Sequence, residues 1–256
     1  MPTWDPTRYL QFADDRSRPF VDLVARVQSD AETIVDLGCG PGHLTEVLRA
    51  RWPDAAIHGV DSSAEMIDRA TGSNDDPATT YELADVSTWS PDAPVDLVVS
   101  NALFQWVPDQ LDVIGRLADH VAPRGTFALQ VPRNYDSPSH TLLRDIASEA
   151  AFAEHTSDIR ADRGTDPVAY LDLFTDRGWD VDLWETTYFH VLDGDDPVLD
   201  WVSGTGARPY LQALPDDLRD AFVAAYRAAL REAYPRRTTG TVFPFRRTFV
   251  VARRRD

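Results

Sequence analysis

The chain has 256 residues, of which 25 are basic, 42 are acidic and 43% are hydrophobic, and its formal net charge is −17 at pH 7. The apolar fraction is large enough to fill a core, so a disordered chain is not the default expectation. A strongly acidic surface repels phosphate backbones and anionic lipid, which argues against nucleic-acid and membrane partners. The basic residues are all arginine and aspartate outnumbers glutamate 34 to 8, which we interpret as a genomic or high-salt bias.

The cysteine and histidine content argues against disulfides and metal sites. Cys39 is the single cysteine, and the six histidines are dispersed without the spacing of a zinc site, so we expect no metal. The N-terminal segment is polar and interrupted by prolines, unlike a signal peptide. Because no apolar run approaches the roughly 20 residues of a membrane-spanning helix, we expect a soluble, cytoplasmic protein.

Short β-rich runs alternate with helical patterns from about residue 20. Apolar residues recur at helical spacing after Pro19, after a glycine turn at 38–42 and after Asp61, where Ser62 or Ser63 would cap the helix. The expected strands are 33–37, 55–60, 81–83, 95–100 and 126–131, with a further helix over 108–121. Strands separated by helices pair in parallel through right-handed crossovers. This order predicts an α/β fold with a doubly wound, mostly parallel seven-stranded sheet.

The second half of the chain is less regular. The expected elements are a helix near 168–177, a strand over 181–192, an amphipathic helix over 215–234 and a closing strand over 248–252. We interpret residues 1–256 as a single domain with a ligand-binding core at 30–132. The insertions at 133–164 and 193–240 would then form a helical cap.

Several polar residues directly follow predicted strands. In a doubly wound sheet, ligands bind beyond the carboxyl ends of the strands, where the strand order reverses. The glycine turn, Asp61, Asp85 and Asn101 should therefore lie along one edge. Two alternatives stay open: Asp85 could be a helix cap or a solvated loop acid, and Trp106 could be core or ligand wall.

The sequence Ile-Val-Asp-Leu-Gly-Cys-Gly-Pro-Gly at 34–42 is the strongest single feature. Glycines lack a Cβ atom and adopt positive φ, so a ligand can approach the backbone closely. His43 stands where the dinucleotide fingerprint G-x-G-x-x-G has its third glycine, which argues against NAD. Asp61 follows Gly40 by 21 positions and could accept hydrogen bonds from both hydroxyls of a ribose.

These motifs carry a resemblance to a known family. The run Asp-x-Gly-Cys-Gly-Pro-Gly, the acids after the second and third strands, and Ser-Asn-Ala-Leu-Phe-Gln-Trp after the fourth resemble class I S-adenosylmethionine-dependent methyltransferases. More narrowly, the chain is similar from end to end to the trans-aconitate 2-methyltransferase family. The segments that carry this narrower resemblance are 4–10, 16–19, 130–132, 138–140, 184–190, 200–210 and 243–247. A generic cofactor-binding fold does not require the last three.

The resemblance implies that S-adenosylmethionine binds and leaves as S-adenosylhomocysteine. The residues it implies are Asp36, Gly38, Cys39 and Gly40 around the methionine part, Asp61 at the ribose, Ser62 along the adenosine, Asp85 and Val86 at the adenine, and Asn101 at the methionyl backbone. A segment around Tyr9, Arg16 and Arg18 would close over the cofactor. Cys39 would be a small turn residue without a nucleophilic role.

The resemblance further implies methyl transfer to a carboxylate of trans-aconitate or a related small polycarboxylic acid, giving a monomethyl ester. Such an acid is already ionised at pH 7, so the reaction requires positioning and no catalytic acid or base. The residues expected to bind the acid are Arg208, Arg246, Arg247, Tyr188, His190 and Tyr210. Adjacent strand residues face opposite sides, so we expect only one of Arg246 and Arg247 to point inward.

Three other functions stay open at this point. The nearest is another small-molecule O- or N-methyltransferase that uses the same cofactor. The second is an NAD-dependent oxidoreductase, and the third is a non-catalytic S-adenosylmethionine sensor. In each case the expected partners are small molecules, and the oligomeric state is not predicted.

Overall fold

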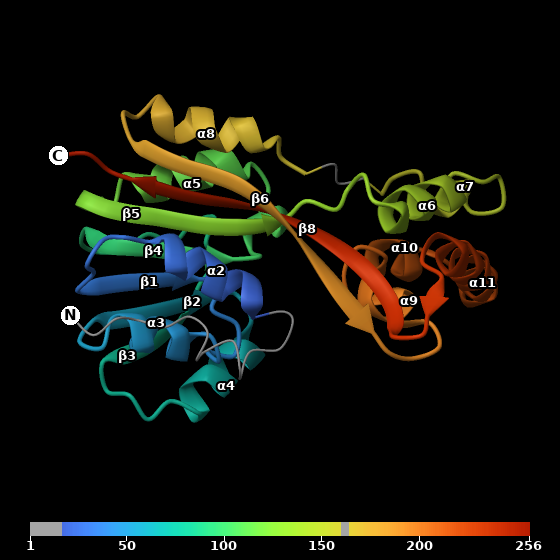
Figure 1. Cartoon of the computed structure of the whole chain (residues 1–256), viewed down its shortest axis with the longest axis horizontal. Coiled ribbons are helices and arrows are strands. Elements are labelled where there is room, and N and C mark those ends of the chain that lie inside the picture. The colour runs from blue at the N-terminus through green and yellow to red at the C-terminus, as the bar shows by residue number, and fades with distance from the viewer. Residues whose placement is uncertain (1–16, 160–163) are drawn as a thin grey trace. The chain divides into compact units, whose positions relative to one another are not determined.

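The computed structural model describes residues 17–159 and 164–256. Within these residues, eight strands form one sheet; seven follow the order β3-β2-β1-β4-β5-β8-β6, and the short β7 pairs with β8 (Figure 1). The strands are β1 (Thr33–Leu37), β2 (Ala56–Asp61), β3 (Thr79–Leu83), β4 (Val95–Asn101), β5 (Val121–Pro132), β6 (Asp180–Leu192), β7 (Arg236–Arg237) and β8 (Gly240–Arg253). Strands β1 to β5 pair in parallel, and β8 is antiparallel to β5. The predicted doubly wound, mostly parallel sheet is confirmed.

Helices connect these strands, and local sequence sets several of their starts. The helices are α2 (Arg18–Arg26), α3 (Thr45–Arg51), α4 (Ala64–Gly72), the 3-10 helix η1 (Phe104–Trp106), α5 (Gln110–Ala118), α6 (Pro138–Ala147), α7 (Ala153–Thr156), α8 (Pro167–Thr175), α9 (Pro197–Ser203), α10 (Arg208–Ala213) and α11 (Asp216–Ala233). Ser63 caps α4, since its hydroxyl accepts a hydrogen bond from the Met66 N–H at 3.4 Å. Asp166 caps α8 in the same way through Val168, directly before Pro167.

The strand order reverses between β1 and β4. Leu37, the last residue of β1, lies opposite Val60 of β2 on one side and Ser100 of β4 on the other. The carboxyl ends of these three strands therefore lie at the same level of the sheet. This edge is where an open α/β sheet binds its ligands.

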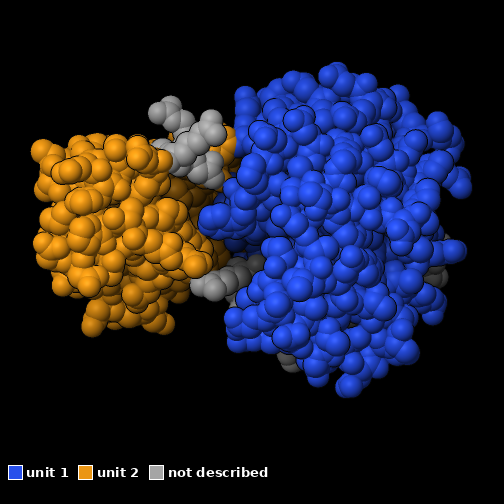
Figure 2. Space-filling view, turned by 180° about the vertical axis from the view of Figure 1, so that it is seen from behind, with its two compact units in different colours: residues 1–132, 165–186, 247–256 blue, residues 133–164, 187–246 orange. Residues whose placement is uncertain are grey.

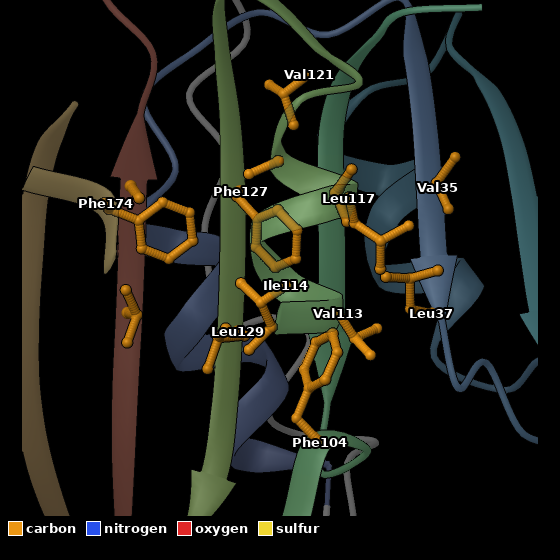
Figure 3. Packing of buried hydrophobic residues seen from close by; sticks show 14 of the residues in the cluster. Val35, Leu37, Phe104, Val113, Ile114, Leu117, Val121, Phe127, Leu129 and Phe174 are labelled. Carbon is orange, nitrogen blue, oxygen red and sulfur yellow. The ribbon is translucent and has the colours of Figure 1, made fainter. Parts of the chain in front are cut away.

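An aromatic and aliphatic core fixes one face of the parallel sheet (Figure 3). The rings of Phe104, Phe127 and Phe174 are fully buried, and the Phe127 ring centroid lies 6.2 Å from that of Phe104 and 5.6 Å from that of Phe174. Leu37 of β1 belongs to this core. Because successive strand residues point to opposite faces, Asp36 is directed to the other face of the sheet.

The chain divides into two compact units, which Figure 2 colours separately. The first unit contains residues 1–132, 165–186 and 247–256, and the second contains 133–164 and 187–246. All five parallel strands belong to the first unit. Both insertions predicted to form a cap, 133–164 and 193–240, belong to the second, and that they cover a substrate stays a prediction.

The second unit has a core of its own. The Phe152 and Phe222 rings meet edge to face, with centroids 5.2 Å apart. Two buried hydrogen bonds tie α11 and the residue that follows it to α6: the Tyr226 hydroxyl donates to the Ser139 carbonyl at 2.6 Å, and the Ser139 N–H donates to the Tyr234 hydroxyl at 3.0 Å. These contacts hold the segments before and after β6 in one body.

The structure departs from the predicted elements where short or interrupted patterns hide them. Helices α9 and α10 have only seven and six residues, too few to show a helical period. Strand β8 begins earlier than predicted because Pro244 interrupts its pattern. Strand β5 begins at Val121 rather than 126, since Pro123 and Gly125 favour a turn; the sheet accommodates them through a register shift against β4.

Candidate functional site

The glycine turn after β1 is anchored to the end of β2. The N–H groups of Gly38 and Cys39 both donate to the Val60 carbonyl, at 2.8 and 3.1 Å. Gly38 has a φ of +71°, and a Cβ atom there would lie 3.0 Å from the Leu103 Cβ. Gly38 is therefore required both by its backbone conformation and by the close approach of the chain after β4.

Gly40 is a different case. Its φ is +57°, and apart from Gly40 and its two chain neighbours no atom of residues 17–159 or 164–256 lies within 4 Å of the position a Cβ would take. The Gly40 N–H donates to Oδ2 of Asp61 at 3.0 Å, while Oδ1 of Asp61 accepts from the Ser63 N–H at 2.9 Å. A carboxylate has about four acceptor sites, so these two bonds fix its direction and leave capacity for the hydroxyls of a ligand. Ser62, between Asp61 and the capping Ser63, is exposed.

Asp36, in the strand before this turn, and Cys39, within the turn, are both buried. Burial, followed by the charge of nearby Asp61, raises the pKa of the Asp36 carboxyl to about 7. Burial, together with Asp36 and Asp61, also raises the pKa of the Cys39 thiol. The thiol therefore stays protonated at neutral pH, which is consistent with a packing role.

The segment after β3 joins the same edge. The Ala84 N–H donates to the Asp61 carbonyl at 3.0 Å, which places the next residue, Asp85, close to the end of β2. Asp85 is exposed, and its Oδ1 accepts from the N–H and the hydroxyl of Ser87 at 2.9 and 2.7 Å; these bonds lower its pKa. Asp85 thus closes a local turn, which corresponds to the loop-acid alternative. Its second oxygen, Oδ2, remains for a ligand. Val86 is buried, whereas Leu83 at the end of β3 is 54% exposed.

Asn101 ends β4 and belongs to a chain of three polar side chains. Arg247 of β8 donates from Nη1 to Oε1 of Gln130 at 3.0 Å, and Nε2 of Gln130 donates to Oδ1 of Asn101. Gln130 is 1% exposed and Arg247 is 7% exposed. Ala102, next to Asn101, has a φ of +56°, and its N–H donates to the Gln130 carbonyl at 2.9 Å. The position of the Asn101 amide is therefore defined by β5 and β8.

The 3-10 helix η1 adds two residues to this edge. Gln105 donates from Nε2 to the Ala102 carbonyl at 2.5 Å. Its Oε1 is buried and has no hydrogen-bond partner within the part of the chain that the structure describes. Trp106 is 61% exposed, so it is not core. The sequence analysis missed Gln105 and Gln130 as site residues; the signal for Gln130 was a lone amide within the apolar run of β5.

Arg246, which was predicted to bind the acid, contacts neighbouring residues of the second unit. Its backbone N–H donates to Oδ1 of Asn134 at 2.6 Å and its Nε donates to the Arg133 carbonyl at 3.1 Å. Its Nη2 also lies 3.7 Å from a carboxylate oxygen of Asp136. The side chain remains 39% exposed, so part of the guanidinium is open to solvent.

Tyr188 and His190 share one face of β6 and are both buried. Their rings are stacked with centroids 6.4 Å apart, and the His190 ring lies 4.9 Å from that of Trp201 and 6.1 Å from that of Phe245. Both residues are thus part of an aromatic cluster in the second unit.

Arg208 and Tyr210 begin α10 in opposite environments. Arg208 is exposed, whereas Tyr210 is 7% exposed in the second unit's core. Burial raises the pKa of the Tyr210 hydroxyl, and the charge of Arg144 opposes the shift. Arg208 therefore offers an accessible cation, and Tyr210 a neutral hydroxyl.

The structure brings the predicted cofactor-binding residues together at one edge of the sheet. They lie at or just beyond the carboxyl ends of β1, β2, β3 and β4 in the first unit. Of the predicted acid-binding residues, Arg247 belongs to the first unit and the other five to the second. Tyr9 and Arg16 lie outside the described residues. Among the described residues, no cluster of three potential metal ligands occurs and no helix is long and apolar enough to span a membrane.

Comparison with known proteins identifies relatives over almost the whole chain. Residues 9–183 match the model of the methyltransferase domain family. A trans-aconitate 2-methyltransferase of Streptomyces avermitilis is 50% identical, with 98% of this chain and 97% of the relative covered. Relatives of the same name from Azoarcus and Mycobacterium tuberculosis are 46% and 44% identical, and the matches cover 98% and 97% of this chain and 99% and 96% of the relatives.

Solved structures show the same fold at low sequence identity. The YcgJ protein of Bacillus subtilis is 14% identical, with a TM-score of 0.59 over 95% of this chain and 100% of the other. A Haemonchus contortus phosphoethanolamine N-methyltransferase, solved with S-adenosylhomocysteine, is also 14% identical, with a TM-score of 0.56 over 93% of this chain and 53% of the other. At this identity the likeness concerns the fold alone.

Proposed function

The chain belongs to the trans-aconitate 2-methyltransferase family, and on that basis we propose that it transfers a methyl group from S-adenosylmethionine to a carboxylate of trans-aconitate. The products are a monomethyl ester and S-adenosylhomocysteine. The observation that carries the proposal is the hydrogen bond between the Gly40 turn and the Asp61 carboxylate at the strand switch point. We also propose that the protein acts in the cytoplasm.

The residues at this edge fit the cofactor. Asp61 has acceptor capacity for two vicinal hydroxyls, and exposed Leu83 offers an apolar surface for a flat base. The buried Oε1 of Gln105, without a partner among the described residues, suits an ammonium group. The cofactor, when bound, supplies an electrophilic methyl group on a sulfonium.

The remaining cofactor contacts are proposed from the same edge. Asp85 and Val86 would bind the adenine, Ser62 would line the adenosine, and Asn101 would bind the methionyl backbone. Asp36, Gly38, Cys39 and Gly40 would surround the methionine part. Since Asp36 has a raised pKa, a cation beside it would favour its ionised form.

The chemistry needs orientation more than proton transfer. A carboxylate with a pKa near 4 is ionised at pH 7, so it can attack without a general base or a metal ion. The protein's part is to align the oxygen with the methyl group and exclude water, which together contribute up to about 7–11 kcal/mol.

Binding of a polycarboxylate requires local positive charge, since a chain of net charge −17 repels an anion at long range. Arg208 is exposed and Arg246 is partly exposed, so we propose that their guanidinium groups bind carboxylates. Arg247 contributes a buried cation near the end of β4. Tyr188, His190 and Tyr210 are proposed as further polar contacts of the acid.

The experiment is an activity assay on the full chain with methyl-labelled S-adenosylmethionine. The acceptors are trans-aconitate, cis-aconitate, citrate and isocitrate, and the products are detected by mass spectrometry. We expect a monomethyl ester from trans-aconitate. If no tricarboxylate yields an ester, the substrate proposal is wrong, and a panel of other O- and N-acceptors tests the nearest alternative.

Calorimetry separates the remaining alternatives. We expect S-adenosylhomocysteine to bind and NADH not to bind. Binding of NADH in its place would support an oxidoreductase. Binding of S-adenosylhomocysteine with no turnover of any acceptor would support a sensor.

A further inference from the structure

We propose that Gln130 and Arg247 are positioning residues that fix the orientation of the Asn101 amide, so that its Nδ2 donor faces a carboxylate of the bound cofactor. This inference rests on the proposed function, because it takes S-adenosylmethionine as the ligand of this edge. It assigns Arg247 a role different from direct binding of the acid substrate.

The argument begins with Arg247, whose guanidinium can only donate hydrogen bonds. Its Nη1 lies 3.0 Å from the side-chain oxygen of Gln130, and both residues are buried. An amide nitrogen at that position would place donor against donor. Arg247 therefore determines which end of the Gln130 amide is the oxygen.

The second step follows from the first. With Oε1 held by Arg247, Gln130 presents its Nε2 to Asn101, and an amide nitrogen is a donor only. The atom of Asn101 that meets it must be Oδ1. The Nδ2 group of Asn101 is then the part of the amide left for a ligand.

The sheet register makes this arrangement rigid. Asn101 lies opposite Gln130 in parallel strands, and Arg247 lies opposite Pro132, two residues further along β5. Residues at these positions share one face of the sheet. The left-handed Ala102, held by the Gln130 carbonyl, also fixes the direction in which the chain leaves β4.

A donor at this place suits a carboxylate. Gln105 offers the complementary group, since its Oε1 is a buried acceptor without a partner among the described residues and its amide is bonded to Ala102. The Asn101 donor and the Gln105 acceptor match the carboxylate and the ammonium group of an amino acid. The carboxylate is therefore assigned to the methionine part of the cofactor.

Gln130→Glu tests the orientation directly. One oxygen of the new carboxylate would still accept from Arg247, but the other would face Asn101 with an acceptor. Asn101 would rotate to donate from Nδ2 and turn Oδ1 toward the ligand. We expect S-adenosylhomocysteine to bind about 10- to 100-fold more weakly, the range for losing a hydrogen bond to a charged group.

The probes are S-adenosylhomocysteine and 5′-methylthioadenosine, which has the same nucleoside but no amino-acid group. Gln130→Glu should lower the affinity for S-adenosylhomocysteine and leave the affinity for 5′-methylthioadenosine unchanged. Gln28→Glu makes the same chemical change at an exposed position and should affect neither. Equal weakening of both ligands by Gln130→Glu would show a general disturbance of the site and overturn the proposal.

A double-mutant cycle tests whether the effect passes through Asn101. In an Asn101→Ala background, Gln130→Glu should cause no further loss of S-adenosylhomocysteine binding. Asn101→Asp, which keeps an acceptor for Gln130 and removes Nδ2, should by itself reproduce the loss. If the two substitutions are additive, or if Asn101→Asp binds as tightly as the wild type, the proposal is wrong.

Kinetics distinguish this inference from the proposed function. If Gln130→Glu raises the KM for the acid and leaves S-adenosylhomocysteine binding unchanged, the carboxylate belongs to the acid and the assignment to the cofactor fails. If the wild type binds S-adenosylhomocysteine but methylates no acid, the proposed substrate fails, while the binding measurements still decide the role of Gln130.

Discussion

Asp61 and Gly40 are 21 positions apart in sequence and are joined by a hydrogen bond of 3.0 Å from the Gly40 N–H to the Asp61 carboxylate. Asp61→Asn should break this relationship, because the amide can offer an oxygen to only one of the N–H groups that the carboxylate accepts. Together with the lost acceptor for a ribose, this predicts an affinity for S-adenosylhomocysteine about 10- to 100-fold weaker, measured by calorimetry.

Asp68→Asn is the matched control for this substitution. It makes the same change on the exposed face of α4 and should leave the affinity unchanged. If Asp61→Asn binds as tightly as Asp68→Asn, Asp61 does not bind the ribose.

Substitution by alanine should affect stability more at Gly38 and cofactor affinity more at Gly40. Both have positive φ, so alanine costs on the order of 1 kcal/mol of backbone strain at either position. At Gly38 the new Cβ would also crowd Leu103, so Gly38→Ala should lower the free energy of unfolding more. At Gly40 the Cβ would meet no other part of the chain that the structure describes and would lie on the proposed ligand side, so Gly40→Ala should lower cofactor affinity more. Denaturant titration and calorimetry on both variants measure the two effects, and equal losses in both measurements would contradict the distinction.

The sheet and its ligand edge could be predicted from sequence because their signals are local. A buried strand followed directly by Gly38, and then a second strand that ends in Asp61, specify both the crossover and the edge. The second unit could not be predicted in the same detail, since α9 and α10 are too short to show a period. Its cap function stays a prediction.

The hydrogen-bond chain behind Asn101 could not be predicted from sequence. Gln130 and Arg247 are 117 positions apart, and only the antiparallel pairing of β5 and β8 brings them together. Sequence reasoning assigned Arg247 to the acid because a guanidinium group can hold a carboxylate bidentately. Nothing in the sequence shows that one of its nitrogens is bonded to a buried amide.

The raised pKa of Asp36 predicts a pH dependence of stability. Between pH about 4 and about 7, the folded protein keeps a proton on Asp36 that the unfolded chain has released. Stability should therefore fall as pH rises through this window and should not change further above it. Since the pKa of Asp36 rises from the ordinary 3.8 of an aspartate to about 7, the loss of stability is on the order of 4 kcal/mol at most.

Asp36→Asn isolates this contribution because the amide does not titrate. The difference in unfolding free energy between variant and wild type should shift in favour of the variant from pH 4.5 to pH 8. Urea titrations of the ligand-free protein measure it. A difference that is constant with pH would mean that Asp36 is ionised throughout.

Arg208 gives the sharpest test of acid binding, because substitutions of exposed residues change stability little. Arg208→Ala should raise the KM for trans-aconitate about 10-fold or more, the range for a hydrogen bond to a charged group, and leave the KM for S-adenosylmethionine nearly unchanged. Arg231→Ala, on the exposed face of α11 in the same unit, removes an arginine that is paired with Asp196 and should change neither constant. If Arg208→Ala raises both constants equally, or neither, Arg208 does not bind the acid.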